Sequence, residues 1–341
     1  MAAPDVLAQA SLLDYISAAW TTQAIATACE LEVPDLLAGG ARELGDLAVE
    51  VQAEVPALAR LLRALSTLDI IEEVEPGSFA LGPLGHLLRR DHAQGLRHWA
   101  LLNGGPLWQR WSTLCSRVRQ GREAEGTEIT DDRFGKLEGD EHEATLFHGA
   151  MLELSRRVGS SLAEALDLQP GALVVDIGGG SGELLSTVLR QHPGACGLLF
   201  DQSHALSHAP PVLQRHGVSG RCRLQAGSFF DFVPADGDVY LMKSILHDWD
   251  DSRAARLLVR CCEALRSGVP LVVVERPMPE RLAATPEHRA LARSDLNMLV
   301  GPGGRERHLR EYEALFARAG LVLRSVDALA AGFSAMRVVR A

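Results

Sequence analysis

The feature that most constrains the fold is the alternation of short apolar segments with helical segments that begins at residue 171. Seven segments have the composition of buried strands: ALVVDIG, ACGLLFD, RCRLQAG, DVYLMKS, PLVVVER, LVLRSVDAL and FSAMRVVR. The helices expected between them include residues 182–191 and 251–266. This alternation predicts an α/β fold with a doubly wound, mostly parallel sheet, which binds ligands at the carboxyl ends of its strands. The last two segments are close in sequence, so we expect a hairpin at the sheet edge.

The first half of the chain has a different, mostly helical texture. Residues 11–38 carry apolar side chains over most of a helix surface, and such a helix is normally buried, here against a second subunit. Residues 42–82 resemble a winged helix, with a wing that turns at Pro76 and Gly77. A chain of 341 residues is long enough for two domains. We therefore expect a helical winged-helix-like domain over residues 1–165 and an α/β domain over residues 166–341.

A winged helix also raises the alternative of a transcription factor, which the charge disfavours. Residues 1–100 contain six arginines and no lysine against fourteen acidic residues, and the whole chain has a net charge of −10. Nucleic-acid readers present Lys and Arg to phosphates. We therefore expect no nucleic-acid partner and no membrane partner. The first residues lack a signal-peptide pattern, and the six cysteines are scattered, which favours a cytoplasmic protein with free thiols.

A glycine-rich loop follows the first strand of the α/β half, in the segment VVDIGGGSGELL. The dinucleotide fingerprint requires a glycine where this chain has Glu183, so that spacing fails. Instead, Asp176 precedes a loop that includes Gly178 and Gly180, and the next strand ends in Asp201. Glycines let a ligand approach the backbone, and an acid at the second strand end suits a ribose diol. A cationic, ribose-containing ligand without phosphate fits this pattern, which favours S-adenosylmethionine over a nicotinamide dinucleotide.

Several segments in order along the chain resemble a known family: VVDIGGGSGELL, LLFDQ, AGSFFD, LMKSILHDWDD, VVVERPMPE and SDLNMLVGPGGRERHLREYEALFARAGL. The family is the class I S-adenosylmethionine-dependent O-methyltransferases of the caffeate and hydroxyindole type, and the resemblance is greatest to actinobacterial members that act on antibiotic precursors. The resemblance covers nearly the whole chain. It implies a homodimer, an N-terminal dimerisation and substrate-lid domain, a Rossmann-like catalytic domain, and a small phenolic acceptor. The products are the methylated acceptor and S-adenosylhomocysteine.

The same resemblance assigns the residues that would carry the reaction. His247 matches the base that removes a proton from the acceptor hydroxyl, and Glu275 and Glu306 match the acids that flank it. The chemistry agrees, because a histidine that titrates near neutrality suits this proton transfer. A carboxylate on its other ring nitrogen would fix the tautomer.

The resemblance also assigns ligand-binding positions. The expected cofactor residues are Asp176, Gly178, Gly180, Asp201, Ser228, Phe229 and Lys243. One departure concerns Ser228, because the family usually has an aspartate before the two aromatic residues. The expected acceptor residues are Phe147, Met151, Asp248 and Met298.

Some alternatives stay open at this level. The same base would serve a C- or N-methyltransferase that acts on an activated aromatic. Relatives on this fold also act as hydroxylases, decarboxylases or pericyclases, but in those the histidine of the LHDW segment tends to be replaced, and here it is present. We expect no metal, because His247 and Asp248 are neighbours on a turn with no second ligand pair at suitable spacing.

Overall fold

The computed structural model describes residues 3–121 and 139–341 of the chain, with side chains from residue 6 onward. The polar segment 121–141, expected to be a loop or hinge, lies largely outside the described residues. The chain forms two compact units: residues 1–109 with 145–153, and residues 110–144 with 154–341. Helix α8 (Glu141–Ala165) contributes residues to both units. The division expected between residues 165 and 166 stays a prediction.

The first unit contains a helical core with a small three-stranded sheet. Its elements are α1 (Ala3–Glu30), α2 (Val33–Leu36), β1 (Arg42–Glu43), α3 (Leu44–Glu50), α4 (Val55–Ser66), β2 (Ile71–Glu75), β3 (Ser78–Leu81), the 3₁₀ helix η1 (Gly85–Leu88) and α5 (Arg97–Gly104). Leu58, Leu62 and Leu65 recur at helical spacing along α4 and form part of the core. The wing predicted at Pro76 and Gly77 is confirmed, because β2 and β3 pair antiparallel across these two residues.

The segment RELGDLAVE, residues 42–50, has the pattern of one short helix, and the structure contains this helix except for its first two residues. Arg42 and Glu43 instead form β1, which pairs antiparallel with Phe79 and Ser78 of β3. The pairing satisfies backbone groups at the open edge of the wing. The helix therefore begins only at Leu44.

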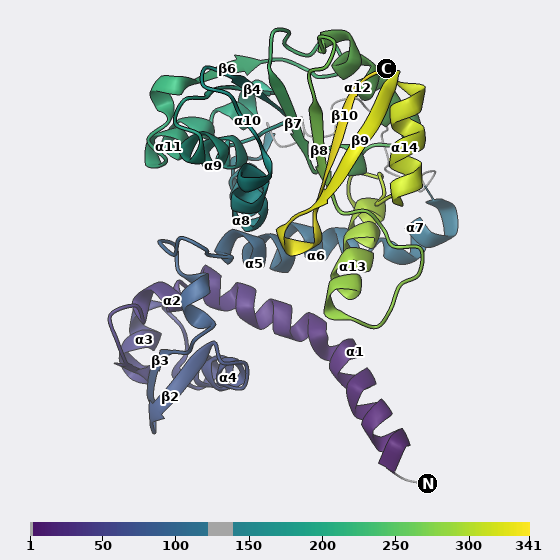
Figure 1. The fold of residues 1–341 in the computed structure, drawn as a ribbon. Helices are drawn as coiled ribbons and strands as arrows, with labels where there is room; N and C mark the ends of the chain where they lie inside the picture. The colour runs from purple at the N-terminus through teal and green to yellow at the C-terminus, as the bar shows by residue number, and fades with distance from the viewer. Residues whose placement is uncertain (1–2, 122–138) are drawn as a thin grey trace. The chain divides into compact units, whose positions relative to one another are not determined.

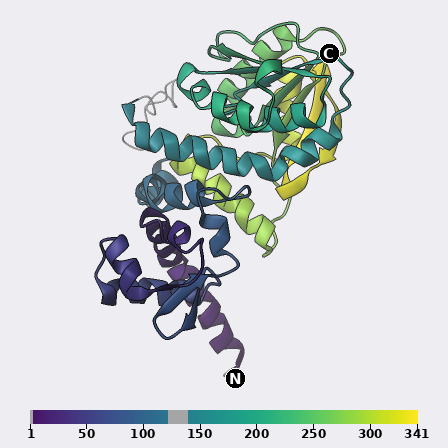
Figure 2. The same cartoon turned by 90° about the vertical axis from the view of Figure 1, so that its left-hand side faces the viewer.

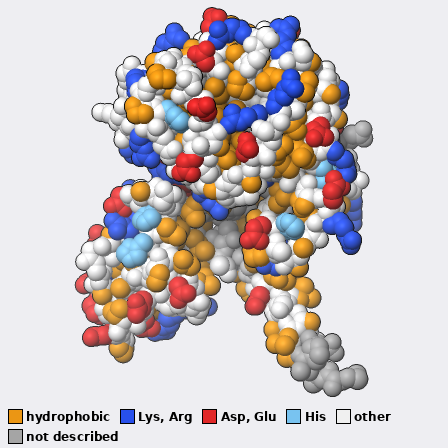
Figure 3. All heavy atoms as spheres, viewed as in Figure 1, with side chains coloured by type: hydrophobic (Ala, Val, Ile, Leu, Met, Phe, Trp, Pro, Cys, Tyr) orange, Lys and Arg blue, Asp and Glu red, His pale blue; other side chains and the backbone are white. Residues whose placement is uncertain are grey.

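The first half of α1 carries large hydrophobic side chains that this chain alone does not cover. Figure 3 shows hydrophobic side chains along this part of the helix. Leu12, Leu13, Tyr15, Ile16 and Trp20 are between 58% and 73% exposed. Later residues of the same helix, including Ala28 and Cys29, are fully buried in the core of the unit. An apolar patch of this kind is typical of a protein–protein interface.

The second unit is built around a seven-stranded sheet in the order β6-β5-β4-β7-β8-β10-β9 (Figure 1). The strands are β4 (Leu173–Ile177), β5 (Cys196–Asp201), β6 (Cys222–Ala226), β7 (Val239–Lys243), β8 (Leu271–Glu275), β9 (Leu321–Ala328) and β10 (Ser334–Arg340). Strands β4 to β8 pair in parallel, and β10 pairs antiparallel with both β8 and β9. Both the mostly parallel sheet and the edge hairpin predicted from the sequence are confirmed.

Helices cover both faces of this sheet, as Figures 1 and 2 show. On one face, α9 (Glu183–Gln191), α10 (Ser203–Leu206), α11 (Ala209–Arg215) and the end of α8 pack on alternate strand residues such as Val174 and Leu241. On the other face, α12 (Asp251–Ala264) and α14 (Leu309–Arg318) pack on residues such as Val175 and Met242. The described part of this unit also contains α7 (Leu114–Gln120) and α13 (Pro286–Val300), while α6 (Pro106–Trp111) spans the change of unit.

The order of the strands places the ligand-binding edge. The chain runs from β4 outward to β5 and β6, and then returns to β7 on the other side of β4. Ligands of doubly wound sheets bind at the carboxyl ends of the strands where the strand order reverses. In this protein that point lies between the loop after β4 and the loop after β7. No helix among the described residues is both long and apolar enough to cross a bilayer.

Candidate active site

The loop between β4 and α9 has a backbone that requires glycine. Gly178, Gly180 and Gly182 have φ angles of +69°, +57° and +77°, a region that favours glycine. A Cβ added at Gly180 would meet no atom within 4 Å, so that side of the loop is open. A Cβ added at Gly179 would instead overlap the carboxylate of Asp176. The loop therefore packs on Asp176 and leaves Gly180 accessible to a ligand.

Asp201, the last residue of β5, holds this loop. Its Oδ2 accepts the backbone N–H of Gly180 at 2.8 Å, and its Oδ1 accepts that of Gln202 at 2.7 Å. Burial raises the pKa of Asp201, although these two hydrogen bonds oppose the rise. Burial, with the nearby charge of Asp201, also raises the pKa of Asp176 to about 7. The sequence placed both acids at strand ends, and the structure shows that both contact the glycine loop, Asp201 through Gly180 and Asp176 against Gly179.

Lys243 is the last residue of β7. Burial lowers its pKa to about 8, and its Nζ lies 5.4 Å from the centroid of the Phe333 ring. Ser228 accepts the backbone N–H of Phe230 through its Oγ at 3.3 Å, so this serine stabilises its own turn. Phe229 packs beside Gly178 and makes an edge-to-face contact with Trp249, with ring centroids 6.1 Å apart. Cofactor binding by these residues stays a prediction.

His247 lies in a short loop between β7 and α12. The backbone of Ser244 has a φ of +54°, and the 3₁₀ turn η5 (Leu246–Asp248) follows. Asp250 then accepts the backbone N–H of Arg253 at 2.9 Å, which caps α12. Asp250, the first of the two aspartates that end LHDWDD, is therefore explained as the N-cap of α12.

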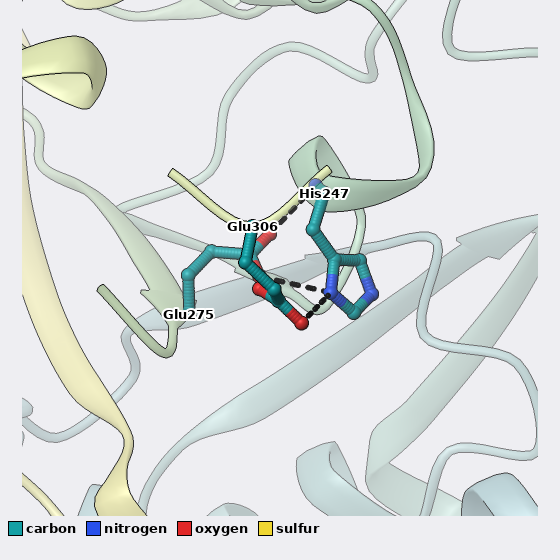
Figure 4. Close-up of side chains that lie close together, drawn as sticks. All are labelled: His247, Glu275 and Glu306. Atoms are coloured by element: carbon teal, nitrogen blue, oxygen red, sulfur yellow. Dashed lines mark hydrogen bonds and ion pairs between the residues drawn. The ribbon is translucent and has the colours of Figure 1, made fainter. Parts of the chain in front are cut away.

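The imidazole of His247 is oriented mainly by Glu306. Its Nδ1 lies 3.1 Å from Glu306 Oε1 and 3.8 Å from Glu275 Oε2. Figure 4 shows the other ring nitrogen, Nε2, turned away from both glutamates. Asp248 Oδ1 lies 3.5 Å from Nε2. The structure thus brings together the three side chains that the sequence predicted, from three separate segments of the chain.

The two glutamates bind different parts of the histidine loop. Oε1 of Glu275 accepts the backbone N–H groups of Ile245 at 3.1 Å and Leu246 at 2.9 Å. Glu275 therefore holds the backbone of the loop, while Glu306 holds the ring. The sequence assigned both to the ring, because it does not reveal which carboxylate oxygen faces which group.

Electrostatics at the ring differ from the sequence-based expectation. Burial alone lowers the pKa of His247, but the charges of Glu306, Glu275 and Asp248 outweigh it and raise the pKa to about 10. Burial raises the pKa of Glu275, whereas the His247 charge and hydrogen bond bring the pKa of Glu306 below its usual range despite its burial. Titration of His247 near neutrality was therefore the wrong expectation. Three acidic groups around one buried imidazole stabilise its protonated form.

A polar chain that the sequence did not indicate continues behind Glu306. Ser294 of α13 donates its hydroxyl to Glu306 Oε1 at 2.6 Å, and Arg276 donates to Ser294 Oγ at 2.6 Å. Arg276 also lies 3.6 Å from Glu306 Oε1. The position of Arg276 directly after Glu275 in VVVER was the available signal. No pattern marked Ser294.

The four residues expected to contact the acceptor fall in both units. Phe147 and Met151 lie on the part of α8 that belongs to the first unit, while Met298 of α13 and Asp248 belong to the second. Of these, Asp248 is beside His247, and Met298 is buried. Their role in acceptor binding stays a prediction.

One nitrogen of His247 and one oxygen each of Glu275 and Glu306 lie within 4.8 Å of one another, a spacing that a divalent cation could also use. The 3.1 Å separation of Nδ1 and Oε1 equally suits a shared proton. The expectation that no metal takes part stays a prediction.

A glycine loop at the switch point of a doubly wound sheet is typical of Rossmann-like enzymes that bind a nucleoside-containing cofactor. The comparison with known families agrees. Residues 111–322 match the O-methyltransferase domain, and residues 13–91 match the O-methyltransferase dimerisation domain. The chain therefore belongs to the O-methyltransferase family and is an S-adenosylmethionine-dependent methyltransferase, as the sequence motifs indicated.

Individual relatives resemble the chain over its whole length. Phenazine O-methyltransferase PhzM of Lysobacter antibioticus is 36% identical over 95% of this chain and 94% of its own. The solved structure of the mitomycin 7-O-methyltransferase MmcR is 33% identical, covers 100% of both chains and has a TM-score of 0.89. An O-methyltransferase from neocarzinostatin biosynthesis, solved with S-adenosylmethionine and 2-hydroxy-5-methyl naphthoic acid, is 32% identical, covers 94% of this chain and 96% of its own, and has a TM-score of 0.77.

Proposed function

We propose that this methyltransferase transfers a methyl group to a phenolic hydroxyl of a small aromatic natural-product intermediate, with His247 as the base. The observation that carries the proposal is the arrangement of the imidazole. Glu306 engages Nδ1 at 3.1 Å, and Nε2, beside which Asp248 Oδ1 lies at 3.5 Å, is directed away from the glutamates. The relatives that act on phenazine, mitomycin and naphthoate compounds support an aromatic acceptor.

The residues of the glycine loop fit the cofactor. Gly180 has an open backbone face, and Asp201 is the acid of the neighbouring strand end. Asp176, Gly178, Gly180, Asp201, Ser228, Phe229 and Lys243 would hold S-adenosylmethionine. When bound, this cofactor supplies a methyl group made electrophilic by its sulfonium. The chain itself has to position and deprotonate the acceptor.

The raised basicity of His247 is consistent with that task. An ordinary phenol has a pKa of about 10, and the surrounding carboxylates raise the pKa of His247 to about 10 as well. With matched pKa values, a proton can pass from the acceptor oxygen to Nε2 at little energetic cost. Glu306 and Glu275 then stabilise the resulting imidazolium. In this step the proton moves from the acceptor hydroxyl to Nε2, so a complex of neutral His247 with a phenol becomes a complex of imidazolium with a phenolate. The number of protons in the complex does not change.

We also infer that the enzyme acts as a cytoplasmic homodimer. The exposed hydrophobic side chains of α1 lie within or beside the segment that matches the dimerisation domain, and they provide an apolar surface for a second copy. All six cysteines are unpaired thiols, in keeping with a reducing compartment.

The experiment is a methyl-transfer assay with labelled S-adenosylmethionine and a panel of hydroxyphenazines, hydroxynaphthoates and catechols. Each acceptor is paired with a matched compound in which the hydroxyl is replaced by hydrogen. We expect label only in compounds with a free hydroxyl, and product NMR should place the methyl on oxygen. Methyl on nitrogen or carbon, or equal labelling of the paired compounds, would contradict O-methylation. Activity should persist after dialysis against EDTA.

A further inference from the structure

The segment Gly304–Arg307 runs along the loop that carries His247. The backbone N–H of Arg305 donates to the carbonyl oxygen of His247 at 2.8 Å. Glu306 engages the ring of the same histidine. A Cβ at Gly304 would overlap the His247 carbonyl oxygen, so the two stretches of backbone are in direct contact. One short segment therefore fixes both the main chain and the side chain of His247.

Arg307 completes this attachment from a fully buried position. Its Nη1 donates to the carbonyl oxygen of Leu246 at 2.7 Å, and its Nη2 donates to that of Trp249 at 2.6 Å. Leu246 precedes His247, and Trp249 follows Asp248, so the guanidinium spans the main chain of His247 and Asp248. The side chain of Arg307 is 0% exposed. A planar guanidinium has several donors in a fixed arrangement, which suits the simultaneous binding of two carbonyls.

The ion pair of Arg307 does not by itself explain its burial. Nε donates to Asp251 Oδ1 at 2.9 Å, but Asp251 is 46% exposed and is also bound by Arg305. An ion pair with a partly exposed carboxylate contributes little to stability, and Arg305 already neutralises this carboxylate. Burying a guanidinium is costly unless its donors are all used. Arg307 meets this condition by donating from Nη1 and Nη2 to the main chain of the His247 loop and from Nε to Asp251.

We propose that Arg307 is a positioning residue for the methyl-transfer reaction: it fixes the main chain on both sides of His247 and so holds Nε2 in one place relative to the acceptor. This inference rests on the proposed function of His247. Among the described residues, the hydrogen bonds and the ion pair of the Arg307 side chain involve Leu246, Trp249 and Asp251 and neither the imidazole nor the glycine loop. Its loss should therefore affect the proton-transfer step and leave adenosyl-ligand binding unchanged.

The test compares Arg307→Lys with Arg310→Met. A lysine retains the charge but cannot reach both carbonyls and Asp251 in one plane. Because a misplacement of about 1 Å can cost about 100-fold in rate, we expect Arg307→Lys to lower kcat by about 10- to 100-fold. The acceptor KM and the Kd for S-adenosylhomocysteine should change less than about twofold. Arg310→Met removes an exposed arginine whose ion pair with Glu280 lies outside the His247 loop, so its kcat should stay within about twofold of wild type.

A double-mutant cycle with His247→Ala separates positioning from general destabilisation. If Arg307 acts through His247, adding Arg307→Lys to His247→Ala should cost almost nothing further in residual kcat. If the two losses multiply, or if folded Arg307→Lys has wild-type kcat, the positioning role is overturned. Full activity in His247→Ala alone would instead overturn the proposed function.

A second variant guards against failure of Arg307→Lys to fold. Asp251→Asn leaves Arg307 in place but removes the carboxylate that orients its Nε. Asp251 is partly exposed, so this variant should fold. We expect a smaller fall in kcat, of about two- to tenfold, that again disappears in the His247→Ala background. Persistence of that loss in the double variant would reject the proposal.

Discussion

The carboxylate of Glu275 approaches His247 from two directions: Oε2 lies 3.8 Å from the ring nitrogen Nδ1, and Oε1 lies 3.4 Å from the backbone nitrogen of the same residue. Glu275 is the last residue of β8 and is only 1% exposed. A strand therefore fixes the position of this carboxylate, and the carboxylate fixes the histidine loop. Glu306, by contrast, belongs to the segment after α13, and its carboxylate contacts His247 through the ring.

Replacement of the proposed base tests the reaction directly. His247→Ala should lower kcat by a factor of roughly 10² to 10⁴, the usual contribution of a positioned general base. The affinity for S-adenosylhomocysteine should be nearly unchanged, because the glycine loop and Asp201 belong to other strands. Steady-state kinetics and titration calorimetry measure the two quantities. Lost adenosyl-ligand binding would make His247 a structural residue instead.

Removal of the charge of Glu306 should change the pH dependence. The carboxylate charges raise the pKa of His247 to about 10, so the rising limb of kcat/KM against pH should lie in the alkaline range. In Glu306→Gln, the amide oxygen of glutamine can still accept a hydrogen bond from Nδ1–H, but the side chain lacks the negative charge. The pKa should therefore fall, by about 1 to 3 units for a neighbouring opposite charge, and the rising limb should move to lower pH. NMR titration of the His247 ring gives the pKa itself, and an unmoved ring pKa would reject the electrostatic role.

Asp201 should contribute to cofactor affinity in two ways. Its carboxylate would bind the ligand directly, and it holds the backbone of Gly180 in the glycine loop. Asp201→Asn should weaken S-adenosylhomocysteine binding by about 1.5 to 3 kcal/mol, typical of hydrogen bonds to a charged group. The exposed Asp231, mutated to asparagine, is the matched control and should bind normally. Equal affinities of the two variants would remove Asp201 from the cofactor site.

Gly304 should tolerate no side chain, because its Cβ would overlap the carbonyl oxygen of His247. We expect Gly304→Ala to destabilise the protein by about 1 to 3 kcal/mol, the usual cost of overpacking, and to lower kcat as the histidine loop shifts. Gly220→Ala is the control, since nothing lies within 4 Å of a Cβ at that position. Thermal unfolding and kinetics should both separate the two variants.

The exposed part of α1 should be a subunit interface. Ile16→Asp combined with Trp20→Asp introduces two charges into an apolar surface, where unpaired charges are costly to bury. Sedimentation velocity should show a dimer for the wild type and a shift toward monomer for this variant. Val49→Asp, at a hydrophobic residue that is 81% exposed but lies on α3, should remain dimeric. A wild-type monomer at micromolar concentration would contradict the dimer.

The sequence allowed prediction of most of the α/β unit, because its strands are apolar, short and separated by clear helical segments. The glycine loop was predictable because its backbone conformation requires glycine. The edge hairpin was predictable because its two strands are close together in the sequence. The convergence of His247, Glu275 and Glu306 was predictable only through resemblance to a family, since they lie far apart along the chain.

What could not be predicted depends on side-chain geometry. The sequence does not reveal that Glu275 binds the loop main chain, that Ser294 links Arg276 to Glu306, or that Arg307 is buried. The pKa of His247 depends on the number of carboxylates packed around it in three dimensions, and its model-peptide value near 6.5 was therefore a poor guide.

The antiparallel strand β10 lies between β8 and β9, with Ser334 opposite Glu275. Without residues 334–340, the backbone of β8 would have an unpaired edge, and exposed edges of apolar strands recruit other chains into aggregates. Shortened or fused versions of the protein that disturb this strand should therefore form insoluble material rather than a weakened enzyme. Affinity tags and fusion partners for biotechnological use are better introduced elsewhere on the surface.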